Sequence, residues 1–474
     1  MANDHPLELD GRQMREIGGA AVELAAEFVS GIPDMPSDLD GALDIAATLR
    51  EPAPEQGAAL DEVLDLVRLG AAKSYNTSGP GMFGFVPGSG LYTSAVAAFL
   101  AAATNRYVTL WSAAPVYAQI EDTAVRWLAD IVGYPASARG VLTSGGTTSV
   151  FSGLVTARVA KLGDDPAGGV LYVSDQTHHA AAKSASLAGL PRRAVRVVPT
   201  TDDLTMDLAE LDRMVAEDVA AGLRPFCVVA SAGTTNTGAV DPLPEIAGLC
   251  RRHDLWLHVD GAYGGAFLLT ERGRAAMRGI ELADSVTLDP HKGFFLPYGT
   301  GALLVREGRL LRDAHDLDAA YLRDVAAEAE IPNIAEYSAE LSRECRGLRL
   351  WLPVKLHGMA AFRDALDEKL DLARTVHEEL SAVPGLELPW RPTLSTVAFR
   401  FAPADGDADE ATNLLLERVN ASGRVFLSST TLRGRVHLRI CVLSFYTHAD
   451  RVAEAVGIVR AAVAELTAAQ RPAA

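Results

Sequence analysis

Apolar positions in the first 75 or so residues follow the spacing of amphipathic helices. They recur every three or four residues at Met14, Ile17, Ala21, Leu24 and Phe28, and again at Leu60, Val63, Leu64 and Val67. Proline-rich stretches at 32–36 and 52–54 separate the helical segments. We therefore predict an N-terminal helical segment, residues 1–75, whose apolar stripes need another surface to pack against.

The middle of the chain alternates short apolar runs with longer amphipathic stretches. The runs VLYVSD, PFCVVASAGTT, LWLHVDGA and DSVTLDP have the length and composition of strands. VYAQIEDTAVRWLADIVG and LPEIAGLCRRHD have helical spacing. This alternation predicts a large α/β domain, residues 76–345, with a mostly parallel sheet covered by helices on both faces.

The last part of the chain has a different order of elements. A long helical stretch comes first, then the strand-like TVAFRFAP and RVHLRICVL, and then the amphipathic DRVAEAVGIVRAAVAEL. The order predicts a smaller α+β domain, residues 346–474.

Composition and charge exclude several classes of protein. With 49% hydrophobic and 22% charged residues, the 474-residue chain has the balance of a globular protein. Its net charge of −18 opposes nucleic-acid binding and favours a small-molecule partner. The chain shows neither a signal peptide nor an apolar run long enough for a membrane span, and its four cysteines are widely spaced. We expect a cytoplasmic protein with reduced thiols, no metal site and no membrane association.

Lys292 is the first candidate for chemistry. It lies just past a strand-like run in DSVTLDPHKGFFLPYGTGALLV, and open α/β sheets bind ligands at the carboxyl ends of their strands. Apolar surroundings make a lysine a better nucleophile, suited to forming a Schiff base. A surface lysine in a loop is the alternative interpretation.

Asp260 precedes Lys292 by 32 residues, at the end of the strand-like run in LWLHVDGAYGG. A buried carboxylate persists only beside a cation or strong donors, and a protonated pyridine nitrogen is such a partner. The pairing would turn a pyridine cofactor into an electron sink. The alternatives, a helix cap or a metal ligand, are weaker because no Cys/His/carboxylate cluster surrounds the residue.

The segment VLTSGGTTSVFSGLVTAR supplies a candidate anion site. Ser144, Gly145, Gly146, Thr147 and Thr148 lie between a short apolar run and a helical stretch. Free N–H groups at a helix start, together with hydroxyl donors, can hold a phosphate. The segment matches neither the P-loop nor the dinucleotide-binding pattern.

Together these segments resemble the group II amino-acid decarboxylases that depend on pyridoxal 5′-phosphate (PLP). HVDGAYGG (258–265) and DPHKG (289–293) are the most specific matches, and TSGGTTS, SDQTHHA and SAGTTNTGAVD follow the family order. The resemblance runs from about residue 10 to 465. It implies fold-type I, the architecture of aspartate aminotransferase, and PLP-dependent decarboxylation of an L-amino acid to an amine and carbon dioxide.

The resemblance also implies residue roles. Lys292 would carry PLP as a Schiff base, Asp260 would hold the ring nitrogen, Ala262 would lie against the ring, and His178 would stack on its other face. The remaining cofactor contacts would come from Gly146, Thr147, His291 and Thr235. Asp289 stands where the family more often has Asn, and an extra carboxylate there is unfavourable unless it is paired.

A homodimer with shared active sites is the assembly that the resemblance implies, and the N-terminal segment would pack on the partner. Tyr337, within DVAAEAEIPNIAEYSAE, would return a proton to the substrate carbon, supplied by the partner subunit. An aromatic substrate is favoured by the local aromatics in the segments that match the family's side-chain pocket. These residues are Phe83, Phe85, Val86, Pro87, Gly88, Thr109 and Trp111.

Four other functions stay open at this point. The family also contains aldehyde synthases that use oxygen, and a transaminase is a further PLP alternative. A phenylalanine at the loop tyrosine would favour the synthase, so Tyr337 favours simple decarboxylation. A scaffold homologue without cofactor would be colourless, and a dehydrogenase-like nucleotide site would need the fingerprint that the chain lacks.

Overall fold

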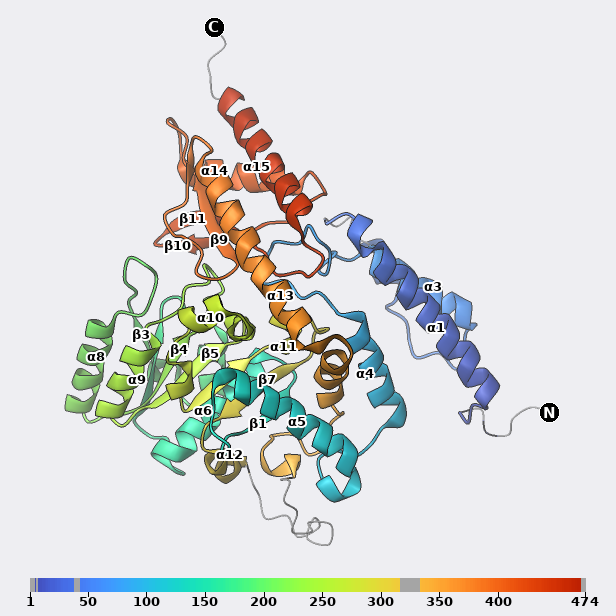
Figure 1. The fold of residues 1–474 in the computed structure, drawn as a ribbon, viewed down its shortest axis with the longest axis horizontal. Helices are drawn as coiled ribbons and strands as arrows, with labels where there is room; N and C mark the ends of the chain where they lie inside the picture. The colour runs from blue at the N-terminus through green and yellow to red at the C-terminus, as the bar shows by residue number, and fades with distance from the viewer. Residues whose placement is uncertain (1–4, 6, 38–42, 316–332, 470–474) are drawn as a thin grey trace.

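A seven-stranded sheet forms the centre of the large domain (Figure 1). The computed structural model describes residues 5, 7–37, 43–315 and 333–469. The strands lie in the order β1-β7-β6-β5-β4-β2-β3, and only β7 runs antiparallel to its neighbours. Their bounds are Arg139–Thr143 (β1), Gly169–Ser174 (β2), Val195–Val198 (β3), Arg224–Ser231 (β4), Trp256–Gly261 (β5), Ser285–Leu288 (β6) and Gly301–Val305 (β7). The predicted mostly parallel sheet is confirmed.

Both faces of this sheet are covered. Successive side chains of a strand point to opposite faces, and every residue of β2, β6 and β7 is buried. The helices of the domain are α4 (Tyr92–Thr104), α5 (Pro115–Val132), α6 (Gly146–Leu162), α7 (Ala180–Leu187), α8 (Leu208–Ala220), α9 (Leu243–Arg252), α10 (Glu271–Ala276), α11 (Pro290–Gly293) and α12 (Gly308–His315). Short 3₁₀ turns connect them at Trp111–Ala113 (η2), Arg192–Ala194 (η3), Gly264–Leu269 (η4), Ile280–Leu282 (η5) and Ile334–Glu336 (η7).

Local sequence sets the ends of several helices. Pro115 opens α5, where its missing N–H is not needed, and Gly133 ends the same helix in a left-handed conformation (φ 84°). The Asp207 carboxylate accepts hydrogen bonds from two backbone N–H groups at the start of α8.

The small domain is built on an antiparallel sheet in the order β10-β11-β9-β8. Its strands are Leu386–Glu387 (β8), Thr396–Phe401 (β9), Ser428–Leu432 (β10) and Arg435–Cys441 (β11). Helices α14 (Ala408–Asn420) and α15 (Ala449–Ala469) pack on it around a core that includes Phe399 and Ile440.

One long helix, α13 (Gly347–Ser381), joins the two domains. Leu350 and Phe362 on its first half belong to the core of the large domain, whereas Val376 and Leu380 belong to that of the small domain. Non-helical backbone at Gly358 kinks the helix within the half that packs on the large domain. The change of domain therefore falls within α13 in the structure, whereas the prediction from the sequence placed it at residue 346.

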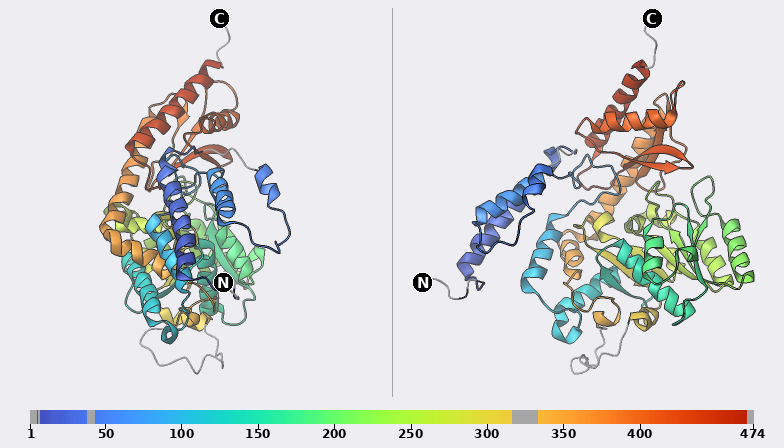
Figure 2. Two further views of the ribbon diagram at one scale, coloured as in Figure 1. Left: turned by 90° about the vertical axis from the view of Figure 1, so that its right-hand side faces the viewer. Right: turned by 180° about the vertical axis from the view of Figure 1, so that it is seen from behind.

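The N-terminal helices stand away from the body (Figures 1 and 2). They are α1 (Gly11–Gly31), α2 (Leu43–Thr48) and α3 (Leu60–Ala72), with the short turn η1 (Ile32–Asp34) after α1. Asp10 and Gln13 form a reciprocal capping box at the start of α1. No residue of α1 or α3 is buried, and Met14 and Val67 are 58% and 54% exposed. We call α1 and α3 the N-terminal arm.

Candidate active site

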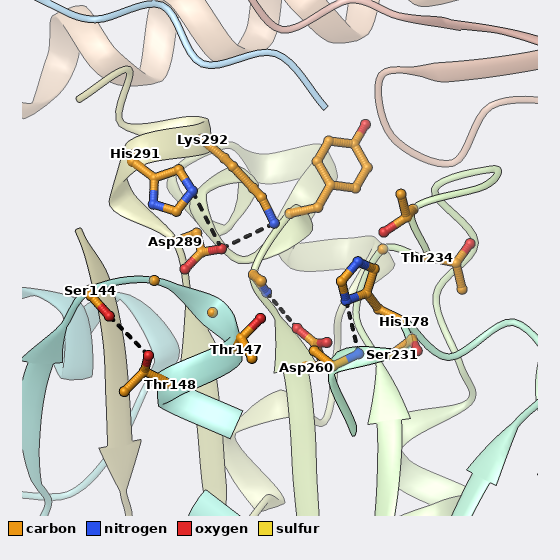
Figure 3. Close-up of a pocket in the computed structure, with 17 residues that line it drawn as sticks. Ser144, Thr147, Thr148, His178, Ser231, Thr234, Asp260, Asp289, His291 and Lys292 are labelled. Atoms are coloured by element: carbon orange, nitrogen blue, oxygen red, sulfur yellow. Dashed lines mark hydrogen bonds and ion pairs between the residues drawn. The ribbon is translucent and has the colours of Figure 1, made fainter. Parts of the chain in front are cut away.

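A cavity of about 340 Å³ opens at the carboxyl edge of the large sheet, where β1, β2, β4, β5 and β6 end. Its volume lies within the usual range of small-molecule sites, and its position is the usual one in open α/β sheets. Figure 3 shows the side chains that converge on it. They are Ser144, Gly145, Gly146, Thr147, Thr148, His178, Ala180, Ser231, Gly233, Thr234, Thr235, Asp260, Ala262, Tyr263, Asp289, His291 and Lys292.

The structure brings eight of the predicted residues to this one cavity. Gly146, Thr147, His178, Thr235, Asp260, Ala262, His291 and Lys292 all line it. They come from five separate stretches of sequence, and the sheet places the ends of those stretches side by side. The roles of these residues stay predictions, but their convergence is a fact of the fold.

One wall of the cavity is the start of α6. Gly145, in a conformation that favours glycine (φ 152°), turns the chain from β1 into the helix. A Cβ atom on Gly146 would lie 2.7 Å from Asp289 Oδ2 and 3.2 Å from Ala262 Cβ, so only glycine allows this approach. Ser144 and Thr148 share a hydrogen bond of 2.9 Å between their hydroxyls. The helix start thus offers backbone N–H groups and hydroxyls to an anion.

Lys292 lies on the facing wall, in the short helix α11 that follows β6. Its Nζ is 3.0 Å from Asp289 Oδ2. His291 Nε2 is 3.8 Å from the same oxygen, while its Nδ1 lies 2.8 Å from the carbonyl oxygen of Thr300. Asp289, whose carboxylate was expected to be unfavourable unless paired, therefore has a partner in Lys292.

Asp260 and His178 form the floor and the opposite side. Asp260 Oδ1 accepts a hydrogen bond from the Ala262 N–H (3.0 Å), which orients the carboxylate. Burial lowers the pKa of His178, and Lys292 adds to this effect while Asp260 opposes it. His178 Nδ1 accepts a hydrogen bond from the Ala180 N–H (3.3 Å), as a neutral imidazole can.

Two buried residues that sequence reasoning did not single out support this edge of the sheet. His258, two residues before Asp260, lies 2.8 Å from Ser285 Oγ and 3.3 Å from Thr287 Oγ1, and burial lowers its pKa to about 4. Asp241 accepts hydrogen bonds of 2.7 Å from the N–H groups of Ser231 and Met206, and burial raises its pKa to about 6. A charge-bearing residue inside a buried run is the sequence signal for both.

Arg439 on β11 is a third residue that the sequence did not reveal. It is buried, and burial lowers its pKa. Its guanidinium donates to the carbonyl oxygens of Asn236 (2.9 Å), Phe85 (3.1 Å) and Thr235. The small domain thereby holds the Thr235 loop at the cavity. No sequence signal marks this contact, because its partners are backbone atoms about 200 and 350 residues away.

Tyr337 does not line the cavity. It follows η7 and borders a different, small pocket between α5 and β1, together with Glu121, Val125 and Arg139. Its side chain packs against the core of its own large domain. The other tyrosine between β7 and α13, Tyr321, lies outside the described residues. The predicted role of Tyr337 therefore gains no support from its position in this subunit.

The residues that were expected to shape a side-chain pocket also lie outside this chain's cavity. Phe83 is buried in the core of the small domain, and Thr109 is buried near η7, where its carbonyl oxygen accepts from the Ala335 N–H. Phe85, in contrast, is 59% exposed and has a positive φ of 55°. The described residues of this chain therefore leave the substrate side of the cavity undefined.

The cavity fits PLP on its own chemistry. The start of α6 suits a phosphate, Lys292 supplies a primary amine, and Asp260 supplies a carboxylate for a protonated ring nitrogen. Among the described residues, no group of three His, Cys, Asp or Glu side chains could hold a metal ion. In the same part of the chain, no helix has the length and apolarity to cross a bilayer.

This sheet order and this cavity define a PLP-dependent enzyme of fold-type I, and comparison with known proteins gives the family. Residues 44–402 match the pyridoxal-dependent decarboxylase conserved domain. The chain is 35% identical to the aromatic-L-amino-acid decarboxylase of Bacillus atrophaeus over 469 residues, which cover 97% of this chain and 98% of that one. The chain belongs to the pyridoxal-dependent decarboxylase family, and it is a PLP-dependent amino-acid carboxy-lyase.

Two further relatives show the range of reactions in the family. The crystal structure of Oryza sativa TDC with PLP and tryptamine superposes with a TM-score of 0.92 at 27% identity, covering 98% of this chain and 100% of that one. The phenylacetaldehyde synthase of Arabidopsis thaliana is 28% identical over 471 residues, which cover 95% of this chain and 96% of that one. Both amine-forming and aldehyde-forming enzymes therefore share this chain's sequence pattern.

Proposed function

We propose that this enzyme decarboxylates an aromatic L-amino acid to the corresponding amine. The observation that carries the proposal is that Lys292 and Asp260 face one cavity from neighbouring strand ends (Figure 3). The similarity to the aromatic-L-amino-acid decarboxylase of Bacillus atrophaeus supports the substrate class.

The chain's own residues divide the work. When bound, PLP supplies an aldehyde and an electron-accepting ring. Lys292 is the amine that attaches the cofactor, and Asp260 keeps a proton on the ring nitrogen. His178, whose pKa is lowered by burial, would pack on the ring when the cofactor is bound. The start of α6 anchors the phosphate and so fixes the position of the reacting end.

A homodimer is the proposed assembly. The N-terminal arm leaves apolar side chains exposed, namely Met14, Ile17, Val63 and Val67. Isolated helices gain most of their stability by packing an apolar face on another surface, and a partner subunit would supply that surface. The substrate side of the cavity is undefined in one subunit, which a partner would remedy. We place the enzyme in the cytoplasm, because all four of its cysteines are free and buried.

Incubation of the purified protein and PLP with a panel of L-amino acids tests the reaction and the substrate together. The panel comprises tryptophan, tyrosine, phenylalanine, glutamate and 2,4-diaminobutyrate. We expect stoichiometric amine and carbon dioxide from an aromatic member. Aldehyde with peroxide would instead identify an aldehyde synthase, and turnover of glutamate or 2,4-diaminobutyrate alone would contradict the substrate class.

Lys292→Ala tests the lysine assignment. We expect this variant to lose turnover and the visible absorbance of the bound cofactor, while its circular dichroism stays that of the wild type. Lys183→Ala, on α7 outside the cavity lining, is the matched control. Wild-type rates in the Lys292 variant would refute the assignment.

A further inference from the structure

Asp289 lies between Lys292 and the start of α6, where the candidate anion site is (Figure 3). It follows β6 directly, at the N-cap position of α11, yet its side chain makes no capping hydrogen bond. The residue is only 4% exposed. Oδ2 contacts Lys292 Nζ at 3.0 Å, whereas the buried Oδ1 has no hydrogen-bond partner.

The same carboxylate also borders the candidate anion site at the start of α6, which we call the anion cradle. The Cβ atom that Gly146 lacks would lie 2.7 Å from Asp289 Oδ2. A phosphate held at the start of α6 would therefore approach a buried carboxylate. Two neighbouring anions repel each other in a buried site, unless a proton lies between them.

Lys292 has the opposite requirement. An ammonium ion that donates to a carboxylate has no lone pair with which to attack an aldehyde. The amine must lose a proton before it can bond to the cofactor. Asp289 Oδ2, at 3.0 Å, is in direct contact to receive it.

We propose that the phosphate of the cofactor drives the ammonium proton of Lys292 onto Asp289. The transfer changes an ammonium–carboxylate pair into a neutral amine and a neutral carboxylic acid. The acid then donates its Oδ2 O–H to the phosphate at the start of α6, which Oδ2 borders. The amine attacks the aldehyde carbon, and water leaves as the new carbon–nitrogen bond forms. Binding of the phosphate thus activates the lysine.

The other titratable groups around Asp289 are on three elements. His291 is on α11, with Nε2 3.8 Å from Oδ2, and it is the competing acceptor for the proton. Asp260 on β5 and His178 before α7 line the same cavity. The first turn of α6, from Gly146 to Ser149, carries no ionisable side chain. Asp289 is the only one of these groups that contacts the lysine amine and also borders the cradle among the described residues.

Separating the phosphate from the aldehyde tests this inference. The holoenzyme is stripped of PLP and incubated with pyridoxal, which has no phosphate, with and without inorganic phosphate. Borohydride trapping and mass spectrometry then measure the rate of labelling at Lys292. In the wild type we expect phosphate to accelerate labelling by about tenfold or more, the effect of removing one close opposite charge on the neutral fraction of an amine.

Asp289→Asn is the decisive variant. Its amide cannot hold the lysine as an ammonium ion, but it can still donate to phosphate. We expect faster labelling by pyridoxal alone and no acceleration by phosphate. His291→Gln should keep the acceleration. Acceleration that persists in Asp289→Asn and vanishes in His291→Gln would overturn the proposal and assign the proton to His291.

The inference rests on the proposed function, and the two can fail separately. If PLP itself does not label Lys292, the proposed function fails. If PLP labels Lys292 but phosphate does not accelerate labelling by pyridoxal in the wild type, only the role of Asp289 fails. The wild-type measurement decides this even if the Asp289 variant does not fold.

Discussion

Gly146→Ala is the substitution that most directly tests how the cavity is built. The new methyl group would lie 2.7 Å from Asp289 Oδ2 and 3.2 Å from Ala262 Cβ. Favourable contacts between such atoms begin near about 3.5 Å. Asp289 cannot easily retreat, because it is buried and paired with Lys292 at 3.0 Å. The start of α6 must therefore move away from α11.

Overpacking of this kind costs about 1–3 kcal/mol. If the whole cost falls on cofactor binding, PLP affinity drops by roughly 5- to 150-fold, since about 1.4 kcal/mol corresponds to a factor of ten. The dissociation constant is measured by fluorescence quenching on titration with PLP. Thermal unfolding of the cofactor-free protein shows whether part of the cost appears as lost stability.

Gly248→Ala in α9 is the matched control, because nothing lies within 4 Å of its missing Cβ atom. This change at a half-buried helical position should leave PLP affinity unaltered and stabilise the fold by up to about 1 kcal/mol. If Gly146→Ala binds PLP as tightly as the wild type and unfolds at the same temperature, the close approach of α6 to α11 is refuted.

Three further changes test the support of the cavity, the assembly and the loop tyrosine. Burial lowers the pKa of His258 from an ordinary 6.5 to about 4, so the unfolded chain takes up a proton first and stability falls as pH drops through this window. In urea unfolding, the free energy of unfolding of the wild type should fall by about 2 kcal/mol between pH 6.5 and 5, and His258→Gln should lack this fall. An equal fall in both proteins would contradict the prediction. Val67→Glu in the N-terminal arm should shift the proposed dimer toward monomer in light scattering, while Leu414→Glu on α14 should not. Equal masses for the two variants would argue against the arm as an interface. Tyr337→Phe should form amine near the wild-type rate, because the side chain packs in its own subunit, whereas loss of a true proton donor costs about 100-fold or more.

The pattern of the sequence was sufficient for the architecture and for most of the cavity. Buried parallel strands are continuous apolar runs, so the strand ends could be located, and polar residues at those ends could be assigned to one site. The motifs around Lys292, Asp260 and Gly146 are local in sequence, which is why each could be found without the fold. All three line the cavity in the structure.

Other features depended on contacts between distant segments, and no local pattern encodes those. The pairing of Lys292 with Asp289 depends on how α11 turns after β6, and the proximity of Gly146 depends on how α6 packs beside it. Arg439 reaches the Thr235 loop only because the small domain folds back onto the large one. Tyr337 was assigned from its place in a loop, but packing between α5 and β1 decides where its side chain lies. Amino-acid order determined which residues come to line the cavity, because strand ends and glycine turns are local properties. Only tertiary packing decided which charges meet, because burial and distance set their energies.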